Sequence, residues 1–288
     1  ETLEGAKAMI EAGILENPHV DAALMFHNIA GSPVKEGTVG VFGPGAVYAS
    51  SGRFEIHIKG VGGHGAAPDW THNPLGAMCA IYQGIHEIVA EHRSPFDSCT
   101  MTVGKMSAGD SANIIPETAI MQGTIRTFSK QVGERLRKDL VTLVEYVGKA
   151  KGVTAEVTFG TACPPLVVDS NVHKSFLCSM KEMFGDEAWD MRTAWGGAYS
   201  KSTSAEDFSY IAEKVPSGFG WIFLGDSRQG RKWGCHNPKV QFNDAYLYRG
   251  AAAYTKAAMD WLLENAAAGT VSDCIRQAEE TLYEMAGN

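Results

Sequence analysis

Closely spaced cysteine pairs are missing from this sequence. Its six cysteines, at positions 79, 99, 163, 178, 235 and 274, form no CxxC pair. A thiolate zinc site of the usual spacing is therefore excluded. Scattered cysteines in a chain of 288 residues are typical of buried thiols in a reducing compartment. We accordingly expect a cytoplasmic protein.

Basic residues and long apolar runs are also scarce. The chain has 25 Lys and Arg against 33 Asp and Glu, which gives a formal net charge of −8. Nucleic acids and anionic membranes are bound by basic patches, so we expect neither as a partner. No apolar run reaches the roughly 18 residues that cross a membrane. The hydrophobic fraction of 44% is ordinary for a globular protein and excludes intrinsic disorder.

The beginning of the chain lacks an initiator Met and a basic-then-apolar signal segment. It opens directly on Glu1, where a helix over residues 1–12 is predicted by apolar residues at helical spacing. We expect that further residues precede Glu1 in the working protein.

The sequence contains two kinds of strand pattern, which predict two kinds of sheet. Residues 20–26 (VDAALMF) and 220–224 (GWIFL) are nearly continuous apolar runs, which are typical of strands buried on both faces of a parallel sheet. Residues 51–59 instead alternate, with Phe54, Ile56 and Ile58 on one face. This alternation predicts a half-exposed antiparallel strand, and we expect it to form an open sheet edge.

The alternating strand begins a βαββαβ order, which is the ferredoxin-like signature. After it we predict a helix at 74–92, strands at 99–106 and 119–128, a helix at 130–151 and a strand at 153–161. Outside this unit, helices are predicted at 172–184, 205–214 and 244–264, and the Gly- and Pro-rich residues 31–45 are predicted to form a loop.

The fold class predicted from these patterns is α/β. An open, mostly parallel sheet, incomplete at its N-terminal side, is interrupted by an inserted ferredoxin-like α+β domain. We place the inserted domain at residues 50–162 and a discontinuous α/β domain at residues 1–49 and 163–288.

Three polar residues are candidates for a metal site. In open parallel sheets, ligands gather at the carboxyl ends of strands. His27 directly follows the first apolar run, His236 lies in the loop GRKWGCHNP, and Glu1 stands at a predicted helix start. One Glu and two His suit zinc or a di-metal site. Each residue taken alone is also compatible with a structural role, as a carboxylate at a helix start or a satisfied histidine.

A fourth candidate is His64, which glycines flank in the segment GVGGHGAAP. Backbone without Cβ atoms can approach a ligand closely and can hold an imidazole out from a sheet. An ordinary glycine-rich turn with an exposed histidine fits the same residues equally well. The segment alone does not choose between these interpretations.

Six motifs together carry a family resemblance. ETLEGAKAMIEAG, GGHGAAP, SANIIPETA, GTIRTF, AEDFSY and CHNPKVQF occur in this order. They resemble the M20 family of metallo-aminohydrolases, most of all the branch that cleaves N-acyl amino acids, hippurate-like amides and auxin conjugates. The resemblance runs from residue 1 to about residue 264. It implies a di-metal catalytic domain with an inserted lid through which two chains form a homodimer.

The resemblance also implies roles for individual residues. Glu1, His27 and His236 look like ligands of two divalent metal ions, which could be Zn, Mn, Ni or Co. His64 looks like the lid histidine that reaches across the dimer and polarises the scissile carbonyl. Asn113 in SANIIP, Arg126 in GTIRTF and Glu206 in AEDFSY look like substrate-binding residues, and a guanidinium suits a carboxylate.

Amide hydrolysis of an N-acyl amino acid or peptide-like substrate is therefore the expected activity. Two alternatives remain open: a dipeptidase or exopeptidase of the same family, and a non-catalytic dimeric binding protein derived from it. In the family, the general base and other ligands precede the position of Glu1, so we expect residues 1–288 alone to be inactive. The sequence HNIAG and the long polar segment GGAYSKSTSAEDF depart from the usual pattern.

Overall fold

The computed structural model describes residues 4–266. They group into two compact units, which are considered separately. The inserted unit comprises residues 4–21, 45–167 and 201–215, and the flanking unit comprises residues 22–44, 168–200 and 216–266. The domain limits expected from the sequence stay a prediction, since contacts add residues 4–21 and 201–215 to the inserted unit.

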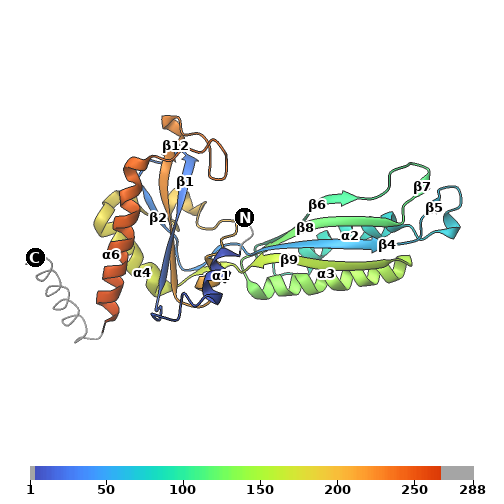
Figure 1. Cartoon of the computed structure of the whole chain (residues 1–288), viewed down its shortest axis with the longest axis horizontal. Coiled ribbons are helices and arrows are strands. Elements are labelled where there is room, and N and C mark those ends of the chain that lie inside the picture. Colours follow the sequence, from blue (N-terminus) through green and yellow to red (C-terminus); the bar gives the residue numbers. More distant parts are fainter. Residues whose placement is uncertain (1–3, 267–288) are drawn as a thin grey trace, which may run out of the picture. The chain divides into compact units, whose positions relative to one another are not determined.

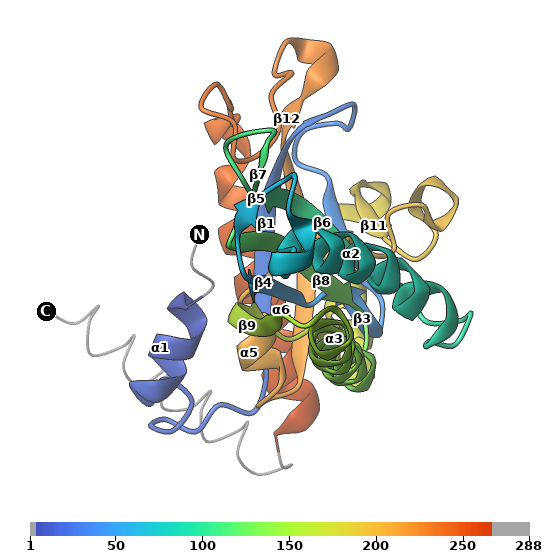
Figure 2. The ribbon, with the colours of Figure 1, turned by 90° about the vertical axis from the view of Figure 1, so that its right-hand side faces the viewer.

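The inserted unit is a four-stranded antiparallel sheet covered on one face by two helices (Figures 1 and 2). Its strands lie in the order β6-β8-β4-β9, which is the spatial arrangement of a βαββαβ unit. Its elements are β4 (Ser51–Lys59), α2 (Pro74–Glu91), β6 (Cys99–Ser107), β8 (Thr118–Thr127), α3 (Lys130–Lys151) and β9 (Thr154–Cys163). Ile56 and Met121 on the sheet pack against Ile81, Ile85 and Leu140 of the helices in one core.

The expectation that residues 54–59 form a sheet edge is wrong. β4 pairs with β8 on one side and with β9 on the other, so it lies inside the sheet. Its alternation arises because α2 and α3 bury one face while the other face meets solvent. The edges of this sheet are β6 and β9.

Local sequence explains where the elements of the inserted unit begin and end. The side chain of Asn73 caps α2, which has Pro74 in its first turn, and Ser129 caps α3. Gly152 ends α3 with a φ of 68°. The shorter elements are α1 (Gly5–Glu11), β3 (Gly45–Tyr48), β5 (Gly63–His64), β7 (Ile114–Ile115), β10 (Leu166–Val168) and α5 (Ser209–Ala212).

The flanking unit is a mixed four-stranded sheet with α4 (Ser170–Phe184) and α6 (Leu247–Asn265) packed on it (Figure 1). Its strands, in spatial order, are β1 (Ala23–Ser32), β12 (Ser217–Asp226), β2 (Val39–Val41) and β11 (Ala188–Asp190). β1 is parallel to β12, β2 is parallel to β11, and β12 is antiparallel to β2. The predicted α/β class with a mostly parallel sheet is therefore confirmed.

Two details of the flanking unit differ from expectation. Residues 31–45 contain strand β2, which is too short, at three residues, to show a strand pattern between glycines. Residues 23–26 are only half-buried, because β1 is the edge strand of the sheet among the described residues. Its only strand neighbour within the described residues is β12, with which it pairs in parallel.

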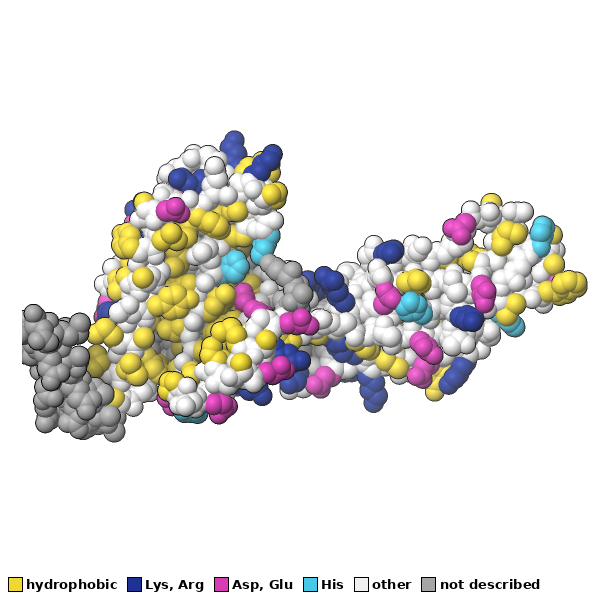
Figure 3. Space-filling model, viewed as in Figure 1, with side chains coloured by type: hydrophobic (Ala, Val, Ile, Leu, Met, Phe, Trp, Pro, Cys, Tyr) yellow, Lys and Arg dark blue, Asp and Glu magenta, His cyan; other side chains and the backbone are white. Residues whose placement is uncertain are grey.

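Apolar side chains also gather on the visible face of the flanking unit (Figure 3). On α6 the exposed large side chains are Leu247, Tyr248, Tyr254, Met259, Leu262 and Leu263. None of the helices within residues 4–266 is long and apolar enough to cross a membrane.

His173 gives the flanking unit a pH-dependent stability. It is 5% exposed on α4, and its Nδ1–H donates to the Phe42 carbonyl over 2.7 Å. Burial lowers the pKa of His173 in the folded state below the ordinary 6.5. The stabilisation that this neutral histidine provides is therefore fully present above pH 6.5, and it is lost as pH falls through the lower pKa of the folded state. Below pH 6.5, we expect protonation at this group to lower the free energy of unfolding, measured with urea, by up to about 1.4 kcal/mol per pH unit.

The matched variant is His173→Gln, which keeps an N–H donor but does not titrate. Its stability should change less than that of the parent between neutral pH and mildly acidic pH. An equal pH dependence in both proteins would contradict the assignment to His173.

Candidate functional site

His27 lies on β1 in a setting that suits a metal ligand. It is half-buried, and it is the register partner of Trp221 on the parallel strand β12. Its Nδ1 lies 2.8 Å from the carbonyl oxygen of Asn28. A carbonyl can only accept, so Nδ1 carries the proton and Nε2 keeps its lone pair. This arrangement is typical of histidines that bind metals through Nε2.

The structure brings His236 next to His27. Their ring centroids are 6.2 Å apart. Because a Zn–N bond measures about 2.0–2.1 Å, imidazoles that share an ion have ring centroids roughly 5–6 Å apart. His236 is exposed and has a φ of 66°, a left-handed conformation that is uncommon for a residue with a Cβ. Such backbone strain is often found at functional sites.

The two histidines suit a divalent metal by donor type, and their rings are slightly farther apart than the roughly 5–6 Å given by one shared ion. They are not a full ligand set. Within the part of the chain that the structure describes, no group of three or more His, Cys, Asp or Glu is placed to hold an ion. The third predicted ligand, Glu1, lies outside the described residues. The predicted metal set of Glu1, His27 and His236 therefore stays a prediction.

His64 and Asn113 lie together at one end of the sheet of the inserted unit. β5 pairs with β7, which places His64 opposite Ile114, and the N–H of Gly65 donates to the Asn113 carbonyl over 2.9 Å. A Cβ at Gly62 would lie 2.9 Å from the carbonyl oxygen of Ile115. The glycines around His64 are thus needed, at least in part, because the two loops approach backbone to backbone.

The contacts of His64 fix its tautomer. Its Nδ1 accepts from the N–H of Ala66 over 3.1 Å, so the ring proton is on Nε2 in the neutral form. The side chain is exposed. An exposed imidazole whose Nε2 carries the proton can donate a hydrogen bond to a carbonyl or an oxyanion.

Arg126 lies near the opposite end of the same sheet. Its register partner is Thr100 on β6. Along β8, Arg126 lies eight residues from Thr118, which is the first residue of β8 that pairs with β4. It lines a hollow of about 360 Å³ within the inserted unit. The other lining residues are Arg93, Pro95, Asp97, Ser98, Cys99, Thr100, Phe128 and Thr203. A guanidinium beside hydroxyl groups in such a hollow can bind a carboxylate.

Glu206 has a local role in the structure. Its Oε1 accepts from the N–H of Phe208 over 3.2 Å, just before α5. Next to it, Asp207 Oδ2 accepts from the N–H of Ala6 over 3.0 Å at the start of α1. The predicted role of Glu206 in binding substrate stays a prediction.

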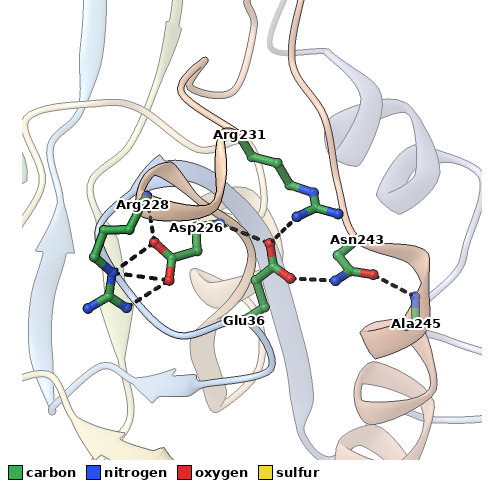
Figure 4. A network of polar contacts seen from close by, with 6 residues as sticks. All are labelled: Glu36, Asp226, Arg228, Arg231, Asn243 and Ala245. Atoms are coloured by element: carbon green, nitrogen blue, oxygen red, sulfur yellow. Dashed lines mark hydrogen bonds and ion pairs between the residues drawn. The ribbon is translucent and has the colours of Figure 1, made fainter.

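The sequence pattern did not point to the polar groups that surround the His236 loop. Cys235 Sγ–H donates to the Asn28 carbonyl over 3.0 Å, so His27 and Cys235 share one acceptor. Buried Glu36 and Asp226 bind Arg231 and Arg228 respectively (Figure 4). The Cys235–Asn28 and Arg231–Glu36 contacts join residues about 200 positions apart, whereas Asp226 and Arg228 are near neighbours in the chain. In the sequence alone, the charged residues in DSRQGRKWGCHNP indicate only a polar loop.

Known proteins support the resemblance seen in the motifs. Residues 49–151 match the family model of the peptidase dimerisation domain. The chain is 31% identical to the IAA-amino acid hydrolase ILR1-like 2 of Arabidopsis thaliana, over 94% of this chain and 60% of that protein. It is 32% identical to the N-acetylcysteine deacetylase of Bacillus subtilis, over 86% of this chain and 60% of that protein. The chain thus spans about 60% of the length of these relatives.

Solved structures show the same fold. A crystal structure of a Bacillus subtilis protein, described as a dinuclear metal-binding peptidase from the M20 family, superposes with a TM-score of 0.68 at 25% identity. The match covers 91% of this chain and 62% of that one. The resemblance to the M20 amidohydrolases is therefore confirmed.

Proposed function

Because the chain carries the peptidase dimerisation domain of the M20 family and its relatives are amidohydrolases, we propose that it is the larger part of an enzyme that hydrolyses the amide bond of N-acyl amino acids. The observation that carries the proposal is the His27–His236 pair, with the Nδ1 of His27 bound to a carbonyl and the two rings 6.2 Å apart. Relatives that act on acylated amino acids support the substrate class.

His27 and His236 would hold divalent metal, together with ligands outside the described residues. When bound, divalent metal lowers the pKa of a water molecule and so supplies the nucleophile at neutral pH. The chain's own contribution is to fix the two imidazoles: the Asn28 carbonyl sets the tautomer of His27.

His64 would polarise the amide carbonyl and stabilise the oxyanion through Nε2–H, since Nδ1 is occupied by the N–H of Ala66. Arg126 would bind the substrate carboxylate. The ladder of β8 from Thr118 to Thr127 spans about 30 Å at 3.4 Å per residue. An N-acyl amino acid is far shorter, so the His64 and Arg126 that contact one substrate would come from two copies.

We therefore propose a homodimer formed through residues 49–151, in which each active site receives His64 and Asn113 from the partner copy. The dimerisation domain match supports dimer formation, and the open edges β6 and β9 offer unpaired backbone groups for association.

The test is a substrate panel with the whole gene product. N-Acetyl and N-benzoyl amino acids should be hydrolysed, and chelation should abolish the activity until Zn, Mn, Ni or Co is restored. Preferred cleavage of unblocked dipeptides would favour the peptidase alternative. Absence of bound metal and of any hydrolysis would favour the non-catalytic alternative.

Arg126→Lys tests the carboxylate site. Lysine keeps the charge but loses the planar pair of donors. We expect KM for N-acyl amino acids to rise at least about tenfold, because a hydrogen bond to a charged group contributes roughly 1.5–3 kcal/mol. Substrates whose carboxylate is blocked as an amide are the control, and their kcat/KM should not change. An equal loss for both substrates would contradict carboxylate binding by Arg126.

A further inference from the structure

The loop that carries His236 leaves β12 at Asp226 and returns at Asn243, just before α6. Asn243 N–H donates to the Leu224 carbonyl over 2.7 Å, which closes the base of the loop. At its tip, Cys235 is bound to the Asn28 carbonyl. A Cβ at Gly31 would lie 2.7 Å from the backbone nitrogen of Gly234, so the tip packs backbone to backbone on the end of β1.

His236 needs this support because its φ is 66°. A residue with a Cβ loses free energy in the left-handed region, so a free loop would relax to other conformations. Something in the fold must hold the loop in the conformation that sets the two rings 6.2 Å apart.

Glu36 contacts both ends of the loop. It lies between β1 and β2 and is 2% exposed. Its Oε1 accepts from the N–H of Asp226 over 3.1 Å and from Arg231 Nη1 over 2.9 Å, and its Oε2 accepts from Asn243 Nδ2 (Figure 4). One carboxylate therefore binds the chain before and after the histidine.

A second carboxylate strengthens the entry to the loop. Asp226 is also 2% exposed, and it binds the N–H and the guanidinium of Arg228 (Figure 4). Those hydrogen bonds lower the pKa of Asp226. Arg228 is thus held to Asp226 and Arg231 to Glu36, and the Glu36 carboxylate contacts the chain at both ends of the loop.

We propose that Glu36 is a positioning residue for His236: it fastens the 226–243 loop so that the imidazole of His236 is held beside that of His27. The role of His236 as a metal ligand rests on the proposed function. The fastening of the loop does not, so the two can be tested separately.

Limited trypsin digestion of the chain tests the fastening without metal. The loop contains cleavage sites at Arg228, Arg231, Lys232 and Lys239. In Glu36→Gln, which keeps shape but removes charge, we expect cleavage within the loop to be about tenfold faster, because local opening controls proteolysis. The matched control is Glu187→Gln, a carboxylate that also binds two cations, Lys35 and Arg249, but none in this loop. It should leave loop cleavage unchanged.

Metal affinity tests the effect on His236. Titration with Co²⁺ or Zn²⁺ should show about tenfold weaker binding in Glu36→Gln, the lower end of what outer hydrogen-bond partners contribute. In a His236→Asn background, Glu36→Gln should have no further effect on affinity. Arg231→Gln removes the cation that binds Glu36 in this loop and should also weaken metal binding. It replaces Glu36→Gln as the test if that variant does not fold.

The outcomes separate the two claims. If Glu36→Gln and Arg231→Gln leave cleavage at Lys232 and Lys239 and metal affinity unchanged while His236→Asn weakens binding, the positioning role is overturned. If the loop opens but His236→Asn leaves metal affinity unchanged, the proposed metal site is overturned and the fastening of the loop stands.

Discussion

Replacing His64 by alanine is expected to lower kcat of the whole gene product about 10²–10³-fold, the usual effect of removing one oxyanion donor. The reason is geometric. The N–H of Ala66 occupies Nδ1, so the proton of the neutral ring is on Nε2, and the side chain is exposed. Because the side chain is exposed, its removal should leave the fold intact.

The matched control is His57→Ala on β4, in the four-stranded sheet of the same unit. His57 is also an exposed histidine, bound to Glu55 on its own strand, and the proposed mechanism gives it no role. Steady-state kinetics should show a kcat close to that of the parent for His57→Ala. A His64→Ala enzyme with the parent rate and an unchanged melting temperature would contradict the carbonyl-polarising role.

The second large effect is expected from His236→Asn. Asparagine tolerates a φ of 66° better than most residues, so the loop conformation is kept while the imidazole is lost. We expect metal affinity to fall more than about 100-fold, since even an outer partner of a ligand contributes 10–100-fold. Activity should fall in proportion to the metal lost.

Calorimetric titration with Zn²⁺ and metal analysis of the purified protein measure this effect. His19→Asn is the control, because His19 is an exposed histidine whose nearest charged partner is Asp21 at 3.9 Å. If His236→Asn retains the metal content of the parent, His236 is not a ligand, and the proximity of the two rings has another cause.

The inserted unit could be predicted from the sequence nearly element by element. Residues 51–59 alternate along the whole of β4, and Lys130–Lys151 is an amphipathic helix with a Ser129 cap and a Gly152 stop. These signals are local, so they can be read from neighbouring residues. What the pattern could not reveal was the position of β4 within the sheet, because an interior strand with one solvent face alternates just as an edge strand does.

The candidate site could be predicted only in part. His27 directly follows one apolar run and His236 lies in the loop after another, and the structure places their rings 6.2 Å apart. Glu36 carried no such signal. Its partners Asp226, Arg231 and Asn243 are 190, 195 and 207 residues away along the chain, so their meeting depends on the packing of β12 beside β1 and β2.

The sequence also does not predict the two short strands β5 and β7. Each has two residues, too few for a strand pattern, and only their pairing brings His64 and Asn113 together. The glycines of GGHG fit both a ligand approach and an ordinary turn, and the structure shows that Gly62 and Gly65 make room for the backbone of residues 113–115.

The most direct test of the central claim is complementation between two inactive variants. Whole gene products carrying His64→Ala or His236→Asn are co-expressed with different tags, and the doubly tagged mixed dimers are assayed on N-acyl amino acids. If metal is held by one copy and His64 comes from the partner, one of the two sites in each mixed dimer is intact, so about half of the parent activity should return. Mixed dimers no more active than either variant alone would contradict the account.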